Sequence, residues 1–151
     1  MEKTSCRSYF AICSAGDIQN GVGFVAAENS FFDPDEITKM LEMQPYNSTL
    51  MGAPRGNGHG FFPFSFWCAC EQTEPAIDAE EQCLKIVREL SPKIPILNKI
   101  RELYNVDFAI EVVPKVFHEQ APILHFNREI IDFCYLTKSE IDIDLYVFNE
   151  E

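Results

Sequence analysis

Two spacings of apolar residues alternate along this chain, and together they restrict it to a fold that combines helices with a sheet. Residues 106–113 place Phe108, Ile110 and Val112 at every second position, which is the period of a strand with one buried face. Residues 95–104 instead repeat apolar side chains three or four positions apart, as an amphipathic helix does. The full order is hairpin, helix, strand, two helices, two strands, helix and strand. This order predicts a single α+β domain over residues 1–151, with helices on one side of a mixed or antiparallel sheet, related to the split βαβ plan.

Residues that cap the first turn predict where three of the helices begin. Asp33 precedes Pro34, whose fixed φ suits the first helical position, and Pro45 ends the apolar pattern. Asp78 and Asn127 precede two further segments of helical period in the same way. The remaining helix is expected over residues 95–104.

Turn residues and alternation predict the strands. Asn20-Gly21 is a strong hairpin signal because both residues tolerate positive φ. Residues 22–28 are therefore expected to return along residues 8–14. Two more strands are predicted, an aromatic run at residues 61–71 that is apolar on both faces and hence central in the sheet, and a short strand at residues 123–126.

The last part of the sequence combines a strand pattern with dense negative charge. The chain has 24 acidic and 12 basic residues, giving a net charge of −12, and residues 140–151 contain no base. Residues 141–148 predict a final strand whose apolar side chains face the core, namely Ile141, Ile143, Leu145 and Val147. A negative field repels nucleic acid and anionic membranes and attracts cationic partners. The candidate contacts for a basic protein are therefore Glu140, Asp142, Asp144 and Tyr146.

The remaining composition is typical of a folded cytoplasmic protein. Hydrophobic residues make up 46% of the chain, yet no run of apolar residues is long enough to cross a membrane. Residues 1–5 lack the basic start and apolar stretch of a secretory signal. The six cysteines are expected to be free thiols, because a chain of this length can bury a core without disulfides.

Several segments together resemble a known bacterial family. Residues 31–38 read FFDPDEIT and are followed by Pro45, Trp67 lies on a predicted strand, and residues 141–146 read IDIDLY. This combination resembles the domain of unknown function numbered 4279, over most of the chain from about Val22 onward. The chain differs from that pattern in an extended N-terminal hairpin and in a loop whose single base is Arg55. The resemblance supports the fold outline and brings no activity. Small acidic proteins of this kind are sometimes encoded beside toxins, which is an argument by analogy.

A second candidate site lies on the aromatic run. Trp67, Phe64 and Phe66 could line a pocket beside Arg55, closed by the Gly-rich loop of residues 46–60. The simpler interpretation of Trp67 is a core residue. Asp142 and Asp144 could also hold a cation, although their simplest role is that of a solvated strand face that discourages aggregation. No spacing of His, Cys or Ser matches a known metal or nucleophile motif, so no cofactor, no metal and no catalytic residue are predicted.

These observations lead to a non-enzymatic binding protein as the leading hypothesis. Its specific form is an immunity-type inhibitor that neutralises a basic bacterial toxin through the carboxylates of residues 140–144. The first alternative is a small-molecule or peptide-binding domain with the aromatic pocket. The second alternative is a metal-dependent hydrolase that uses Asp142 and Asp144.

Overall fold

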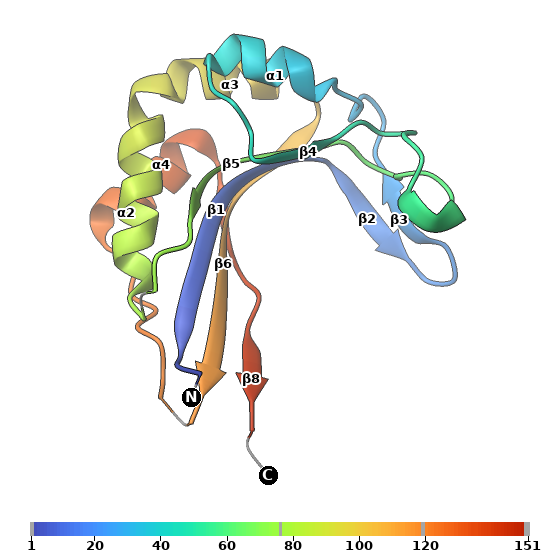
Figure 1. Ribbon diagram of the computed structural model, residues 1–151. Helices are drawn as coiled ribbons and strands as arrows, with labels where there is room; N and C mark the ends of the chain where they lie inside the picture. The colour runs from blue at the N-terminus through green and yellow to red at the C-terminus, as the bar shows by residue number, and fades with distance from the viewer. Residues whose placement is uncertain (1, 76, 119, 150–151) are drawn as a thin grey trace. The chain divides into compact units, whose positions relative to one another are not determined.

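The computed structural model describes residues 2–75, 77–118 and 120–149 and confirms the α+β class (Figure 1). The strands are β1 (Ser5–Ser14), β2 (Gly16–Gln19), β3 (Gly23–Ala26), β4 (Asn47–Thr49), β5 (Phe66–Gln72), β6 (Val106–Phe117), β7 (Glu140–Ile143) and β8 (Tyr146–Phe148). The helices are α1 (Pro34–Leu41), α2 (Ala79–Leu90), α3 (Ile94–Leu103) and α4 (Arg128–Thr137), with short 3-10 turns at Gly56–Gly58 and Ser91–Lys93. The main sheet is mixed and has the order β4-β5-β1-β6-β7, with β8 also paired to β6, while β2 and β3 form a separate sheet.

The chain divides into two compact units, each built from separate stretches of sequence. Unit 1 comprises Met1–Phe10, Cys70–Pro92 and Ala109–Glu151, and unit 2 comprises Ala11–Ala69 and Lys93–Phe108. The strands β1, β5 and β6 each contribute residues to both units.

In unit 2, the caps predicted from the sequence form the expected helix. The Asp33 carboxylate accepts a hydrogen bond of 2.9 Å from the Asp35 amide, and Pro34 begins α1. The helix ends at Glu42, which adopts the left-handed conformation with φ of 51°. α1 contacts α3, and the Lys93 ammonium donates to the Leu41 carbonyl.

The predicted turn at Asn20-Gly21 forms, but the strand after it pairs with a different segment from the one expected. Residues 23–26 return along β2, with Asp17 opposite Val25, and not along residues 8–14. The reason is that Gly16 begins a new short strand directly after β1, so the Asn20-Gly21 turn closes on that strand. The Gly16 Cα lies so close to Val25 that a Cβ there would come within 2.3 Å of the Val25 carbonyl oxygen, which explains the glycine.

In unit 1, α2 and α4 pack against each other and lie on one side of the strands (Figure 1). Both caps were predicted: Asp78 accepts from the Glu80 amide and Asn127 from the Ile130 amide. α4 connects β6 to β7, which run parallel, as expected when a helix crosses between strands. The buried face of these helices includes Cys83, Ile86, Leu90, Ile130 and Phe133.

Gln82 forms buried polar contacts between α2 and β1. Its side-chain oxygen accepts a hydrogen bond of 2.8 Å from the Ser8 hydroxyl, and its amide nitrogen donates to the Cys6 carbonyl at 2.8 Å. The same nitrogen contacts the Glu74 carbonyl at 3.3 Å. Gln82 and Ser8 are both buried, so this network is shielded from water.

Two strand predictions in unit 1 are wrong. Residues 123–126 do not form a strand, and Ile123 makes only an isolated bridge to Asp78. Residues 141–148 are not one strand, because pairing with β6 stops at Val112 and resumes at Lys115. The gap in β6 contains Pro114, which has no N–H to donate to a neighbouring strand.

The expected inward orientation of the final strand is also corrected. Ile141 is half-buried, but three other apolar side chains are exposed, namely Ile143, Leu145 and Val147. β7 ends the strand order of the sheet, so these residues lie at a sheet edge.

Candidate functional site

The face of unit 1 opposite the helices gathers the acidic residues of the sheet. In the register of β6 and β7, Glu140 lies opposite Ala109 and Asp142 lies opposite Glu111. Side chains at opposed positions of neighbouring strands point to the same face. Since the alternate residues Ile110 and Val112 are buried, the face that carries Glu111 and Asp142 is the other one, and we call it the open face.

Glu111 interacts with three other carboxyl groups, those of Glu140, Asp142 and Asp144, and we call the four together the acidic edge. Burial is the main cause that raises the pKa of Glu111 to about 8, and a hydrogen bond to Asp142 and the charges of Asp142, Asp144 and Glu140 add to it. With a pKa of about 8, Glu111 holds its proton at neutral pH, and its carboxyl O–H donates a hydrogen bond to Asp142. The charges around Glu111 therefore act on its protonation.

Tyr146, the first residue of β8, lies beside the acidic edge. Its hydroxyl donates a hydrogen bond of 3.1 Å to an Asp144 carboxylate oxygen. This hydrogen bond, with the Asp144 charge, raises the pKa of Tyr146. All four residues predicted as partner contacts, Glu140, Asp142, Asp144 and Tyr146, thus lie in one coherent region.

The acidic edge is bordered by exposed apolar side chains. Exposed fractions are 41% for Ile143, 52% for Leu145, 59% for Val147 and 45% for Phe148. The Phe148 ring stacks on Phe117 with 4.5 Å between centroids. An edge strand with apolar side chains in water is a typical site for pairing with another chain.

The predicted pocket residues lie in unit 2 and separate into two groups. Trp67 is fully buried, and its indole N–H donates a hydrogen bond of 3.0 Å to the Thr38 hydroxyl of α1. This placement favours the core role of Trp67. Phe64 and Phe66 are half-buried and contact each other with 5.8 Å between ring centroids.

Arg55 lies beside the aromatic group. Its guanidinium is 5.3 Å from the centre of the Phe62 ring, and that ring is 6.3 Å from Phe66. Phe24 of β3 also contacts Phe64 at 5.2 Å. The Phe24–Phe64 and Phe62–Phe66 pairs meet edge to face and the Phe64–Phe66 pair is tilted, as aromatic residues in a small satellite core are.

Sequence reasoning missed Glu111 as a member of the acidic site. The alternation in residues 106–113 correctly placed Glu111 on the wet face of its strand. Its contact with Asp142 depends on the register of strands that are separated by α4, and no local pattern encodes that register.

Two further features of the described residues concern metal binding and the cysteines. No group of three or more His, Cys, Asp or Glu among residues 2–75, 77–118 and 120–149 could hold a metal ion. All six cysteines are free thiols, as predicted. Burial raises the pKa of Cys83 to about 12 and that of Cys134 to about 11, so both stay protonated and are poor nucleophiles.

Comparison with known proteins places the chain in a family. The profile of the family described as Domain of unknown function (DUF4279) matches residues 4–148, which include the strands of both units. The chain belongs to this family. No curated protein and no solved structure matches it. Within the described part of this DUF4279 protein, no helix is both long and apolar enough to span a membrane.

Proposed function

We propose that this DUF4279 protein is a non-enzymatic binding module whose acidic edge receives a basic protein. The observation that carries the proposal is that Glu111 and the three carboxyl groups around it lie in one region with a strand at the edge of the sheet and exposed apolar side chains. A strand face whose acids only keep it in water would not need apolar side chains beside them, yet Leu145, Val147 and Phe148 are exposed. Protein interfaces commonly join an apolar centre to a polar or charged rim.

The charge distribution suggests how the partner would bind. The net charge of −12 attracts a cationic protein over a long range and increases its association rate. At the surface, Lys or Arg of the partner would pair with Glu140, Asp142 and Asp144. The apolar side chains of β8 would then be covered, which supplies affinity that does not depend on salt.

The specific form of the proposal is inhibition of a basic toxin in the cytoplasm. An inhibitor of this kind needs a preformed surface of opposite charge and no catalytic group. A toxin gene beside the gene of this chain would support it. The aromatic-pocket and hydrolase alternatives stay untested predictions. The residues discussed above supply neither a described cavity for the first nor a set of metal ligands for the second.

Neutralising two carboxylates tests the acidic edge directly. The variant Asp142→Asn with Asp144→Asn should bind the partner at least about tenfold more weakly, since each charge-assisted hydrogen bond contributes about 1.5–3 kcal/mol. Binding to the products of neighbouring genes should be measured by calorimetry at low and high salt. The wild-type affinity should fall with salt, and the variant should show a smaller dependence.

A matched control removes the same charge elsewhere. Glu89→Gln with Glu102→Gln changes two exposed acids, one on α2 and one on α3, that are not members of the acidic edge. This variant should bind like the wild type. An equal loss of affinity in both variants, or no salt-sensitive binding to any neighbouring product, would contradict the proposal.

Binding should also release a proton. A cation at Asp142 and Asp144 offsets the negative charges that add to the effect of burial on the pKa of Glu111, so this pKa should fall and part of the bound proton should be released. Calorimetry at pH 7 in buffers of different ionisation enthalpy should therefore show release of up to about one proton per complex. The variant Glu111→Gln should bind without this release. Proton release that persists in the variant would point to a different group.

A further inference from the structure

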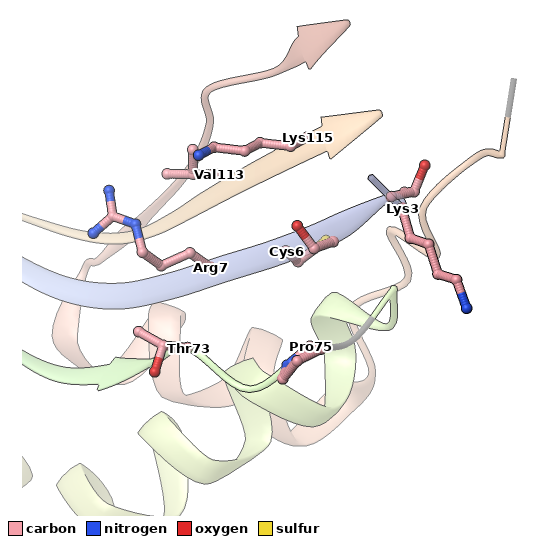
Figure 2. A pocket seen from close by; sticks show the side chains of 9 residues that line it. Lys3, Cys6, Arg7, Thr73, Pro75, Val113 and Lys115 are labelled. Carbon is pink, nitrogen blue, oxygen red and sulfur yellow. The ribbon is translucent and has the colours of Figure 1, made fainter. Parts of the chain in front are cut away.

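The open face also carries a hollow whose charge is opposite to that of the chain. It has a volume of about 370 Å³ and lies where β1 and β6 run side by side near the start of the chain (Figure 2). Three of its nine lining residues are basic, Lys3, Arg7 and Lys115, and none is acidic. The whole chain has twice as many acids as bases. The excess of basic residues around the hollow therefore does not follow from the composition of the chain.

The basic residues are brought together by strand alternation. Arg7 follows Ser5 by two positions on β1, and Lys115 follows Val113 by two positions on β6, so both pairs line the hollow. In Figure 2 the charged ends of Arg7 and Lys115 extend toward the same end of the hollow, whereas Lys3 extends from the other end. The Ser5 and Thr73 side chains add hydroxyl groups to the lining.

Arg7 is held in place, and Lys115 is available. The Arg7 guanidinium forms an ion pair of 3.1 Å with Glu71 and lies 4.9 Å from the centre of the Tyr9 ring. Lys115 is exposed and has no ion pair with any acid in the described part of the chain. Arg7 therefore supplies a fixed wall, and the ammonium of Lys115 supplies the charge that a ligand would meet.

A flat apolar wall adjoins this charge. A second hollow of about 430 Å³ shares Lys3, Ser5 and Lys115 with the first and is lined further along by Phe117 and Phe148, with Glu2 also in its lining. The two rings are stacked, with an angle of 6° between their planes. Stacked rings with one face in reach of a hollow suit a planar ligand.

We propose that these adjoining hollows form a binding site for a small organic anion, a planar ring that bears a carboxylate or a phosphate. The acidic group of the ligand would contact Lys115 and the hydroxyls near it, and the ring would lie against Phe117 and Phe148. This site adjoins the acidic edge, because Lys115 lies opposite Tyr146 in the pairing of β6 with β8. It also shares Phe148 with the apolar side chains that the proposed basic partner would cover. A ligand here would therefore compete with that partner for β8.

The test uses the full chain and three probes: salicylate, adenosine 5′-monophosphate and inorganic phosphate. Titration calorimetry or ligand-observed NMR should show saturable binding of the two planar anions, and weaker binding of phosphate, which lacks a ring. Lys115→Gln should weaken the planar anions about tenfold, since it removes one charge-assisted hydrogen bond. Phe148→Ala should weaken the planar anions and leave phosphate unchanged.

Lys99→Gln is the matched control, because Lys99 is an exposed lysine on α3 and lines neither hollow. It should bind all three probes like the wild type. The proposal would be overturned by an absence of saturable binding to the wild type, by equal losses in Lys115→Gln and Lys99→Gln, or by planar anions that bind no better than phosphate. Circular dichroism should show that each variant is folded, as expected for exposed positions.

Discussion

Replacing Glu111 by Gln is expected to stabilise the protein against heat, and the gain should grow with pH. The native pKa of Glu111 is about 8, above its ordinary value of 4.5. Native Glu111 therefore keeps a proton that the unfolded chain loses between these pH values. The wild type loses stability as the pH rises through this window, and a glutamine, which cannot ionise, does not. If Glu111 were fully shielded from solvent, the pKa shift would correspond to a larger gain in the free energy of unfolding. Because Glu111 is half-buried, solvent screening reduces the expected gain to about 2 kcal/mol above pH 8.

Thermal unfolding between pH 4 and pH 9 measures this effect. The two proteins should melt together near pH 4, and Glu111→Gln should melt about 4–8 °C higher near pH 8. Glu89→Gln provides the control, since Glu89 is an exposed glutamate of α2, and its melting curve should follow the wild type at every pH. A constant difference at all pH values would show that packing, not ionisation, separates the proteins.

Replacing Gln82 by Ala is expected to destabilise the protein by about 3 kcal/mol, because it leaves buried polar groups without partners. The Ser8 hydroxyl and the Cys6 carbonyl would each lose a hydrogen bond of 2.8 Å. Gln82 and Ser8 are both buried, so these groups lie away from solvent. The free energy of unfolding from urea titration measures the loss.

An exposed glutamine provides the comparison for Gln82. Gln44 is exposed in the segment after α1, and Gln44→Ala should change the free energy of unfolding by less than about 0.5 kcal/mol. A loss below about 1 kcal/mol for Gln82→Ala would mean that the network contributes little beyond the apolar contacts of α2.

The helices could be predicted from the sequence because their signals are local. Asp33, Asp78 and Asn127 each accept a hydrogen bond from a backbone amide two or three residues further on. A cap and an apolar stripe lie within one stretch of chain, so each helix start could be found without knowing the rest of the fold. The α+β class followed from the order of these elements.

Pairing between distant segments could not be predicted in the same way. The split between β7 and β8 arises from Pro114 on a neighbouring strand, and the raised pKa of Glu111 arises from Asp142 across that pairing. The sequence correctly predicted a dense set of acids near Asp142 and Asp144. It gave no sign that Arg7 and Lys115 line a common hollow, because the two residues lie far apart in the sequence and no local pattern connects them.

The hydroxyl of Thr4 contacts the backbone of Phe117, 113 positions away. During synthesis on the ribosome, the segment that will become β1 emerges long before β6 exists, and β6 emerges before β7 and β8 can cover its edge. β5 can pair with one edge of β1 early in synthesis, but the other edge stays open until β6 emerges, and closing so long a loop makes this half of the sheet slow to assemble. The open edge of β1 in the nascent chain is therefore expected to be a site of aggregation or chaperone contact until β6 covers it.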